Sequence, residues 1–312
     1  MLFRSLPQRL KAQLEKGITS TFSPIDYTPY VFEVKKRVET GEIIGPRIFA
    51  SGPILMKSGN HYACGGNDAT EVAWCNDHVY LPTDTPEKAA ASVRELHEKG
   101  ADVIVLDLMT NQSTFDPASF DAVIAEAKKL GLKVVSHNTN ARDVPYILAN
   151  GLDGFVHPPS VIEDTDGSLL AGADIKNTFV PATLGFYQRY IAEGLANADD
   201  IATYELQRNN VLKMYENGAK PLFASDMPGL PAEEIIPTVI GVMQGLGIDN
   251  KAILISATRT AATELLGRQD IGTIETGKIA DIIMLDADPV SDITALNHVS
   301  TVIQGGKVVF TK

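Results

Sequence analysis

Three short apolar stretches of the sequence end in a residue that can bind a metal ion. They are Val134-Val-Ser-His137, Gly154-Phe-Val-His157 and Leu222-Phe-Ala-Ser-Asp226. Short apolar runs bounded by turn residues are typical of buried strands, and the active sites of parallel barrels lie at the C-terminal ends of the strands. Two imidazoles and a carboxylate that converge there would suit Zn²⁺ or a similar divalent ion. A single histidine is more often a hydrogen-bonded loop residue, but three such residues at matching strand ends favour a metal site.

The elements that would position these residues alternate regularly from residue 85 onward. Short strands between helices of ten or more residues predict a parallel sheet with helical crossovers. Seven strands are predicted, one short of the eight that close a TIM-like (β/α)8 barrel. We therefore predict an α/β fold, a TIM-like barrel that lacks its first strand. The predicted strands cover residues 18–22, 47–52, 103–108, 133–136, 155–156, 178–182 and 221–224, and the predicted helices cover residues 5–17, 27–40, 86–99, 117–130, 142–150, 198–217, 232–245 and 250–266.

One long segment interrupts this alternation. Residues 53–84 are polar and rich in Gly, Asn and Thr, which predicts a long loop, and long loops in compact domains are usually functional or mobile. The segment holds both cysteines of the chain, Cys64 and Cys75. They could form a local disulfide or remain two unlinked thiols, and their spacing does not decide between these alternatives.

The tail of the chain has a different pattern. Residues 272–286 and 299–310 are β-type runs with glycine turns, and Gly305-Gly306 between two β-rich stretches predicts a hairpin. We therefore expect a small β-sandwich appendage in residues 269–312 and the barrel in residues 1–268.

Composition and charge limit the classes of function. With 44% hydrophobic and 21% charged residues, 312 residues suit a globular protein with a sizeable core. The net charge of -12 argues against nucleic acid as a partner. The absence of a run of 18 apolar residues argues against a membrane span. A genuine start at Met1 would predict a cytoplasmic protein, whereas a signal segment in front of it would predict a periplasmic or secreted one.

Several stretches resemble a known family. The tail carries Gly272-Thr-Ile-Glu-Thr-Gly-Lys-Ile-Ala-Asp281, Leu285-Asp-Ala-Asp-Pro289 and Ile303-Gln-Gly-Gly-Lys-Val308. It resembles the C-terminal end of the amidohydrolase superfamily, in particular the imidazolonepropionase-like and Xaa-Pro dipeptidase-like branch. Gly41-Glu-Ile-Ile-Gly-Pro-Arg-Ile48 and Gly59-Asn-His61 are similar to the same branch. The resemblance covers nearly the whole chain and implies a metal-dependent hydrolase with a barrel and a β-sandwich.

The resemblance gives the three strand-end residues specific roles. His137 matches the metal ligand at the end of the fifth barrel strand, and His157 matches the ligand at the end of the sixth. Asp226 matches the eighth-strand aspartate, which touches the metal and takes a proton from the attacking water. The implied reaction is hydrolysis of a carbon–nitrogen bond in an amide, a cyclic amide or a dipeptide-like small molecule by metal-activated water. Zn²⁺ is the expected ion.

The sequence departs from the family pattern at two places. The family opens its barrel with a strand that carries a His-x-His pair, and none of the six histidines here forms one. At the fourth strand, where the branch usually has a lysine that bridges two metals, this chain has Val105. One ion is therefore expected instead of two. Asp107 lies two residues further on the same strand face and could serve as a carboxylate ligand or as a cap carboxylate.

The missing strand has consequences for partners. Open edges are expected at the strands of residues 18–22 and 221–224, and unpaired edges invite strand addition. The chain is therefore expected to be a fragment of a longer protein, to receive strands from a partner chain, or to form a homo-oligomer. Recovery of a folded monomer would count against this hypothesis.

Loops after the strands supply the expected substrate contacts. His61 matches a family turn in the long loop, and Tyr187 and Arg189 follow the seventh strand. Arg189 could clamp a substrate carboxylate in bidentate fashion or form a surface salt bridge. Two alternatives to a hydrolase stay open. One is a pseudoenzyme that binds a small molecule or a partner chain, and the other is a different metal-dependent reaction, such as deamination or decarboxylation, on the same scaffold.

Overall fold

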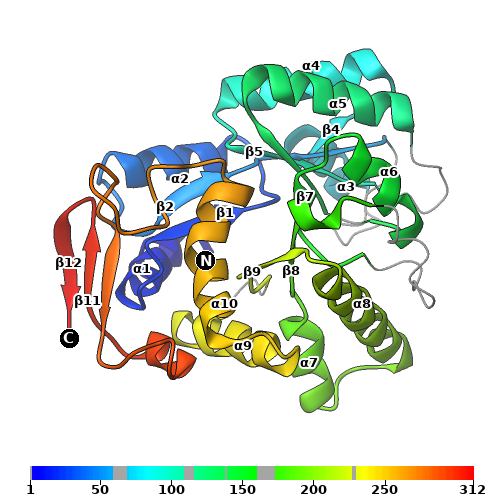
Figure 1. Cartoon of the computed structure of the whole chain (residues 1–312). Coiled ribbons are helices and arrows are strands. Elements are labelled where there is room, and N and C mark those ends of the chain that lie inside the picture. The colour runs from blue at the N-terminus through cyan, green and yellow to red at the C-terminus, as the bar shows by residue number, and fades with distance from the viewer. Residues whose placement is uncertain (1, 59–68, 109–115, 138, 160–172, 227–229) are drawn as a thin grey trace.

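A central parallel sheet with helices around it forms the main body of the molecule (Figure 1). The computed structural model describes residues 2–58, 69–108, 116–137, 139–159, 173–226 and 230–312. In this part of the chain the sheet contains seven strands in the order β4-β3-β5-β6-β7-β8-β9. Its strands are β3 (Ile54–Met56), β4 (Tyr80–Pro82), β5 (Val103–Leu106), β6 (Lys133–Ser136), β7 (Gly154–Phe155), β8 (Phe179–Pro181) and β9 (Lys220–Leu222). All neighbouring pairs are parallel, which confirms the predicted α/β class.

The first two strands form a separate parallel pair beside this sheet. β1 (Ser20–Ser23) pairs with β2 (Arg47–Ala50), and β2 leads after a short connection into β3. The single strand predicted over residues 47–52 therefore corresponds to β2 alone, and β3 follows as an additional strand. The backbone N–H of Asp102 donates to the carbonyl of Ala50 at 2.8 Å, so β2 also reaches the start of β5.

The crossover helices on β5 and β6 have the bounds that the sequence predicts. Thr85 caps α4 (Pro86–Lys99) by accepting from the N–H of Lys88, and Asp116 caps α5 (Pro117–Leu130) by accepting from the N–H of Ala118. Gly131 ends α5 with φ of +72°, a conformation that favours glycine. The other helices are α1 (Leu2–Glu15), α2 (Tyr30–Glu39), α3 (Ala69–His78), α6 (Val144–Ala149), α7 (Gly185–Ala192), α8 (Ala198–Glu216), α9 (Ala232–Gly245) and α10 (Asn250–Ile255). None of the helices in the described ranges is long and apolar enough to cross a membrane.

Two predictions of secondary structure are wrong. Residues 53–84 are not one long loop, because β3, α3 and β4 lie within them. Cys75 on α3 is disulfide-bonded, and Cys64 lies outside the described residues. The segment after β8 was predicted to be a loop, and it contains α7.

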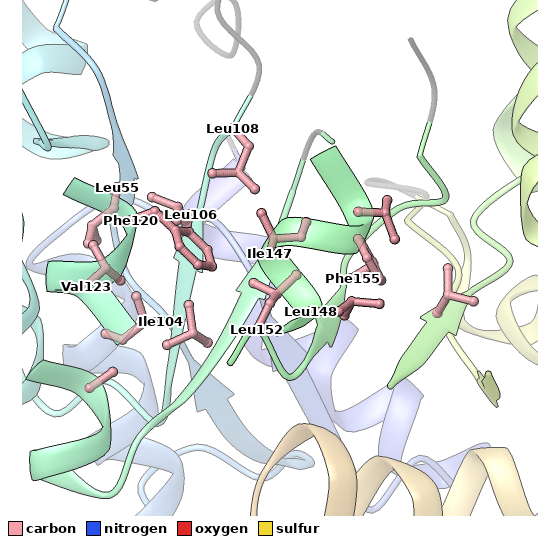
Figure 2. Close-up of a cluster of buried hydrophobic side chains, with 14 of the residues drawn as sticks. Leu55, Ile104, Leu106, Leu108, Phe120, Val123, Ile147, Leu148, Leu152 and Phe155 are labelled. Carbon is pink, nitrogen blue, oxygen red and sulfur yellow. The ribbon is translucent and has the colours of Figure 1, made fainter. Parts of the chain in front are cut away.

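Apolar side chains between the sheet and its helices form the largest core cluster (Figure 2). Leu55 and Leu106 come from neighbouring strands, and Phe120 and Ile147 come from helices that cover them. All four are at most 3% exposed. Burial of such side chains contributes roughly 1.5–3 kcal/mol each, so this cluster fixes the strands that lead to the predicted site.

A helical segment lies between β9 and the β1–β2 pair (Figure 1). The predicted helix over residues 250–266 is α10 followed by a π-helix, Ser256–Leu265. Leu265 is buried in one cluster with Leu222 of β9, and Phe22 of β1 packs against that cluster. Within the described residues, β9 pairs only with β8 and β1 only with β2. Apolar packing of this segment therefore connects β9, one end of the seven-stranded sheet, with the separate β1–β2 pair.

The tail forms a small antiparallel sheet of β10 (Ile282–Leu285), β11 (Val299–Gln304) and β12 (Lys307–Thr311). The predicted hairpin is confirmed, since Gly305 and Gly306 join β11 to β12 with φ of +57° and +79°. The strand predicted across residues 272–286 is limited to β10. Leu14 of α1 is buried with Val299 and Val302, so the tail packs on the first helix. The predicted boundary between residues 268 and 269 stays a prediction.

Candidate metal and catalytic site

Four candidate residues follow the C-terminal ends of parallel strands. His137 comes directly after β6, Asp107 directly after β5, His157 two residues after β7, and Asp226 four residues after β9. The backbone N–H of His137 donates to the carbonyl of Leu106 at 3.0 Å, which continues the parallel pairing beyond the strands. Because parallel strands end at the same edge of a sheet, the four side chains share one rim.

The two histidines are in contact. Their ring centroids lie 4.7 Å apart, with an interplanar angle of 72°. Nδ1 of His137 lies 3.8 Å from Oδ2 of Asp107, and Nε2 of His157 lies 3.7 Å from Oδ2 of Asp226. Both distances are too long for a hydrogen bond. The rim therefore carries two histidine–carboxylate pairs joined by an edge-to-face ring contact.

His157 is also fixed from the other side of its ring. Its Nδ1 lies 2.7 Å from Oγ1 of Thr183, a hydrogen-bond distance. Burial, together with the positive charge of a protonated His137, lowers the pKa of His157 to about 3. The imidazole is therefore neutral at pH 7, as a metal ligand must be. Thr183 was not among the residues predicted for the site, although it follows the apolar run of β8 as His137 follows that of β6.

Asp226 has an unusual backbone. Its φ of +46° is the one positive value at a non-glycine position in the described residues. Aspartate tolerates this region better than most residues, yet such outliers concentrate at functional sites. The side chain is half-exposed. Partial removal from water raises the pKa of Asp226, and positive charge on His137 opposes this rise.

Asp107 and Val105 lie on the same side of β5. Val103 and Val105 are fully buried in the inner cluster with Val135 of β6. Asp107 continues this period-two pattern, and its side chain is fully buried next to His137. The position at which the resemblance implies a bridging lysine is thus occupied by a valine in an apolar cluster.

The predicted substrate contacts have different surroundings. Tyr187 on α7 is half-buried, and its pKa is raised by burial and then by the negative charges of Asp200 and Asp226. This places its hydroxyl in the field of the site. Arg189 on the same helix pairs with Glu193 at 2.8 Å and Glu234 at 3.4 Å, which is the surface salt-bridge arrangement. A role of Arg189 in substrate binding stays a prediction, and His61 lies outside the described residues.

The donor types fit a divalent ion. Neutral imidazoles and carboxylates are the ligands that Zn²⁺ and related ions take in catalytic sites, and both imidazoles meet here with a carboxylate beside each. In the described ranges, no group of three or more such side chains is gathered tightly enough to hold an ion. The residues that would hold an ion here are the two pairs of His137 with Asp107 and His157 with Asp226.

Comparisons with known proteins agree with this architecture. The sequence model of the amidohydrolase family matches residues 3–309. An imidazolonepropionase from Thermoanaerobacter pseudethanolicus is 26% identical over 64% of this chain and 45% of its own length. A crystal structure of a prolidase complexed with N-methylphosphonate-L-proline is 26% identical, with a TM-score of 0.75 over 100% of this chain and 80% of the prolidase.

A third comparison shows the fold alone. The crystal structure of ochratoxinase from Aspergillus niger is 19% identical, with a TM-score of 0.81 over 99% of this chain and 76% of the ochratoxinase. The chain spans less than half the length of the imidazolonepropionases that it matches. The similarity in fold thus extends over nearly the whole chain.

Proposed function

Because this chain belongs to the amidohydrolase family, we propose that it hydrolyses a carbon–nitrogen bond of a small molecule with the help of one divalent ion, most simply Zn²⁺. The observation that carries the proposal is the meeting of His137 and His157, each beside a carboxylate, at the C-terminal rim of the parallel sheet. The names of two similar proteins, an imidazolonepropionase and a prolidase, support the reaction class.

The residues divide into ion-holding and proton-transferring groups. His137, His157 and Asp107 would hold the ion, together with one oxygen of Asp226. When bound, a divalent ion supplies Lewis acidity, which activates water and polarises a carbonyl group. Asp226 would accept the proton of the attacking water at a carboxylate oxygen and return it to the leaving nitrogen.

The segments that follow the strands, helix α7 among them, would orient the substrate. Tyr187 is the first candidate, because its hydroxyl lies in the electrostatic field of Asp226. The proposed substrates are amides, cyclic amides and dipeptide-like molecules. Among these, His61 and Arg189 would distinguish substrates by hydrogen bonds and by charge.

Zn²⁺ content tests the proposal directly. Wild type, His137→Ala and His97→Ala are reconstituted with Zn²⁺, freed of excess ion and analysed for bound zinc. His97 is exposed in the last turn of α4 and serves as a matched histidine control. We expect about one equivalent in the wild type and in His97→Ala, and its loss in His137→Ala. A panel of dipeptides, cyclic amides and aryl amides then tests hydrolysis. Equal zinc in all three proteins would contradict the assigned ligands.

A second candidate function is binding without catalysis. It is favoured by Val105, which is fully buried in the apolar inner cluster at the position of the implied bridging lysine. A chain of this kind would bind a small molecule or a partner chain at the same rim. Absence of zinc from the reconstituted wild type, together with no hydrolysis across the panel, would favour this candidate.

A further inference from the structure

We propose that Thr183 is a positioning residue that determines which ring nitrogen of His157 faces the site. The inference rests on the proposed function in one respect, the assignment of His157 as a ligand. Nothing in the sequence pattern indicated this role, since threonine is neither a metal ligand nor an acid–base group here.

The geometry assigns opposite sides of the His157 ring to different partners. Nδ1 lies 2.7 Å from Oγ1 of Thr183, whereas Nε2 is directed to Asp226, 3.7 Å from its Oδ2. Thr183 is only 5% exposed, so bulk water does not compete for its hydroxyl. A hydrogen bond in such surroundings is costly to leave unmade.

In a neutral imidazole, the hydrogen bond between Thr183 and His157 determines which of the two tautomers is present. One ring nitrogen carries the proton and the other carries the lone pair. If Nδ1–H donates to Oγ1 of Thr183, the lone pair of Nε2 points toward Asp226 and is free to bind an ion. The opposite tautomer would place a proton on Nε2 and close that position. Histidines that ligate metals usually donate their second N–H to an oxygen in this way.

The position of Thr183 suits such a role. It follows β8, and the N–H of Leu184 donates to the carbonyl of Ala182 at 2.8 Å, which turns the chain directly after the strand. The β-branched side chain has few χ1 rotamers, so Oγ1 is held in place. Thr178, next to the start of the same strand, is a matched control: it is 1% exposed, and its Oγ1 donates to the carbonyl of Asp153 at 3.0 Å.

The first test reads the tautomer by long-range ¹H–¹⁵N NMR of the histidine rings in the metal-free protein at pH 7. The His157 signals are assigned by their absence from His157→Gln. We expect the Nδ1–H form in wild type, Thr183→Ser and Thr178→Val, and a mixture or the Nε2–H form in Thr183→Val. An Nε2–H form in wild type, or an unchanged tautomer in Thr183→Val, would overturn the inference.

The second test measures the affinity for Zn²⁺ in the same variants. Thr183→Val should bind Zn²⁺ about 10–100-fold more weakly, which is the usual effect of removing a hydrogen-bond partner of a ligating histidine. Thr183→Ser should stay close to wild type. Thr178→Val should lower the free energy of unfolding without weakening Zn²⁺ binding.

The two tests separate this inference from the proposed function. A wild type that binds Zn²⁺ but hydrolyses nothing would contradict the proposed activity and leave the role of Thr183 supported by affinity and tautomer. A wild-type protein that binds no Zn²⁺ would contradict the proposed use of this ion. The tautomer of His157 alone would then test the role of Thr183. Equal affinity and equal tautomer in wild type and Thr183→Val would overturn the role whatever the activity.

Discussion

Aspartates flank the parallel strands at both ends, and the surroundings of their carboxylates differ between the two ends. At the N-terminal end, Asp102 precedes β5 and Asp153 precedes β7. Oδ2 of Asp102 accepts from Nζ of Lys35 at 2.6 Å and from the N–H of Ala50 at 2.8 Å. Asp153 accepts from Nζ of Lys133 at 2.6 Å and from the N–H of Val134 at 2.9 Å. Each carboxylate is engaged by a cation and by a backbone donor.

At the C-terminal end, Asp107 and Asp226 face imidazoles across 3.8 and 3.7 Å. Those separations exceed hydrogen-bond length. Asp226 also has a backbone in the left-handed region. Short, charge-assisted hydrogen bonds to Lys35 and Lys133 stabilise the fold at the N-terminal end, whereas the C-terminal end brings two imidazoles and two carboxylates next to one another. Ion pairs and backbone hydrogen bonds thus anchor the N-terminal end of this sheet, and the grouping at the C-terminal end supports the proposal that the chemistry takes place there, as in parallel barrels.

Among the predictions, Asp226→Asn should have the largest effect, a lower kcat/KM with little change in the free energy of unfolding. It should therefore distinguish the two ends of the sheet most clearly. It removes the proposed proton acceptor, and loss of such a group typically lowers the rate about 10²–10⁴-fold. Asparagine tolerates positive φ as aspartate does, so the free energy of unfolding should change by less than about 0.5 kcal/mol. The measurements are kcat/KM on a substrate from the hydrolysis panel and urea unfolding. Nearly unchanged kcat/KM would show that Asp226 is not the proton acceptor.

Asp102→Ala should show the opposite pattern. The substitution leaves the ammonium of Lys35 and the N–H of Ala50 without this acceptor, and an unmet donor of this kind costs about 1–3 kcal/mol. We expect a lower free energy of unfolding in urea and an unchanged kcat/KM for the remaining folded protein. Asp107→Asn, at the other end of the same strand, is the matched variant and should weaken Zn²⁺ binding more than it weakens the fold. A lower kcat/KM in folded Asp102→Ala would contradict the assignment of this aspartate to stability.

Local chemistry explains which helices could be predicted. α4 and α5 begin after Thr85 and Asp116, which cap them, and each is followed by a glycine with positive φ. These features lie within the helix or next to it, so the sequence alone indicates them. α7 was missed because its N-cap, Leu184, makes no side-chain capping bond. β3 was missed because it is three residues long, and its burial depends on pairing with β4 and β5, which are distant in sequence.

Some features of the candidate site could likewise be predicted from the sequence, and others could not. His137, His157 and Asp226 were predicted because each is a metal-binding residue type placed just after an apolar run. The contact between the two rings and the bond from His157 to Thr183 could not be predicted, since both depend on how β6, β7 and β8 align. The alternative roles of Arg189 also needed the structure, because Glu234 is 45 residues away in sequence.

Asp26, three residues after β1, offers the smallest effect and asks whether burial destabilises a carboxylate outside the site, as it does at Asp226. Burial raises the pKa of Asp26, although bonds from the N–H of Tyr27 and the hydroxyl of Ser23 oppose the rise. A carboxyl group with a raised folded-state pKa contributes most to stability below its unfolded pKa, and the contribution is lost as pH rises through the folded-state value.

Asp26→Asn removes this titration and keeps an acceptor for the N–H of Tyr27. Relative to wild type, the variant should therefore be more stable at pH 7 than at pH 3, by less than about 1 kcal/mol. Urea unfolding at the two pH values gives the difference, and Glu33→Gln, at an exposed position on α2, is the control. A difference of the opposite sign would mean that the two hydrogen bonds outweigh burial. Asp26 would then be held as firmly as Asp102 and Asp153 at the N-terminal end.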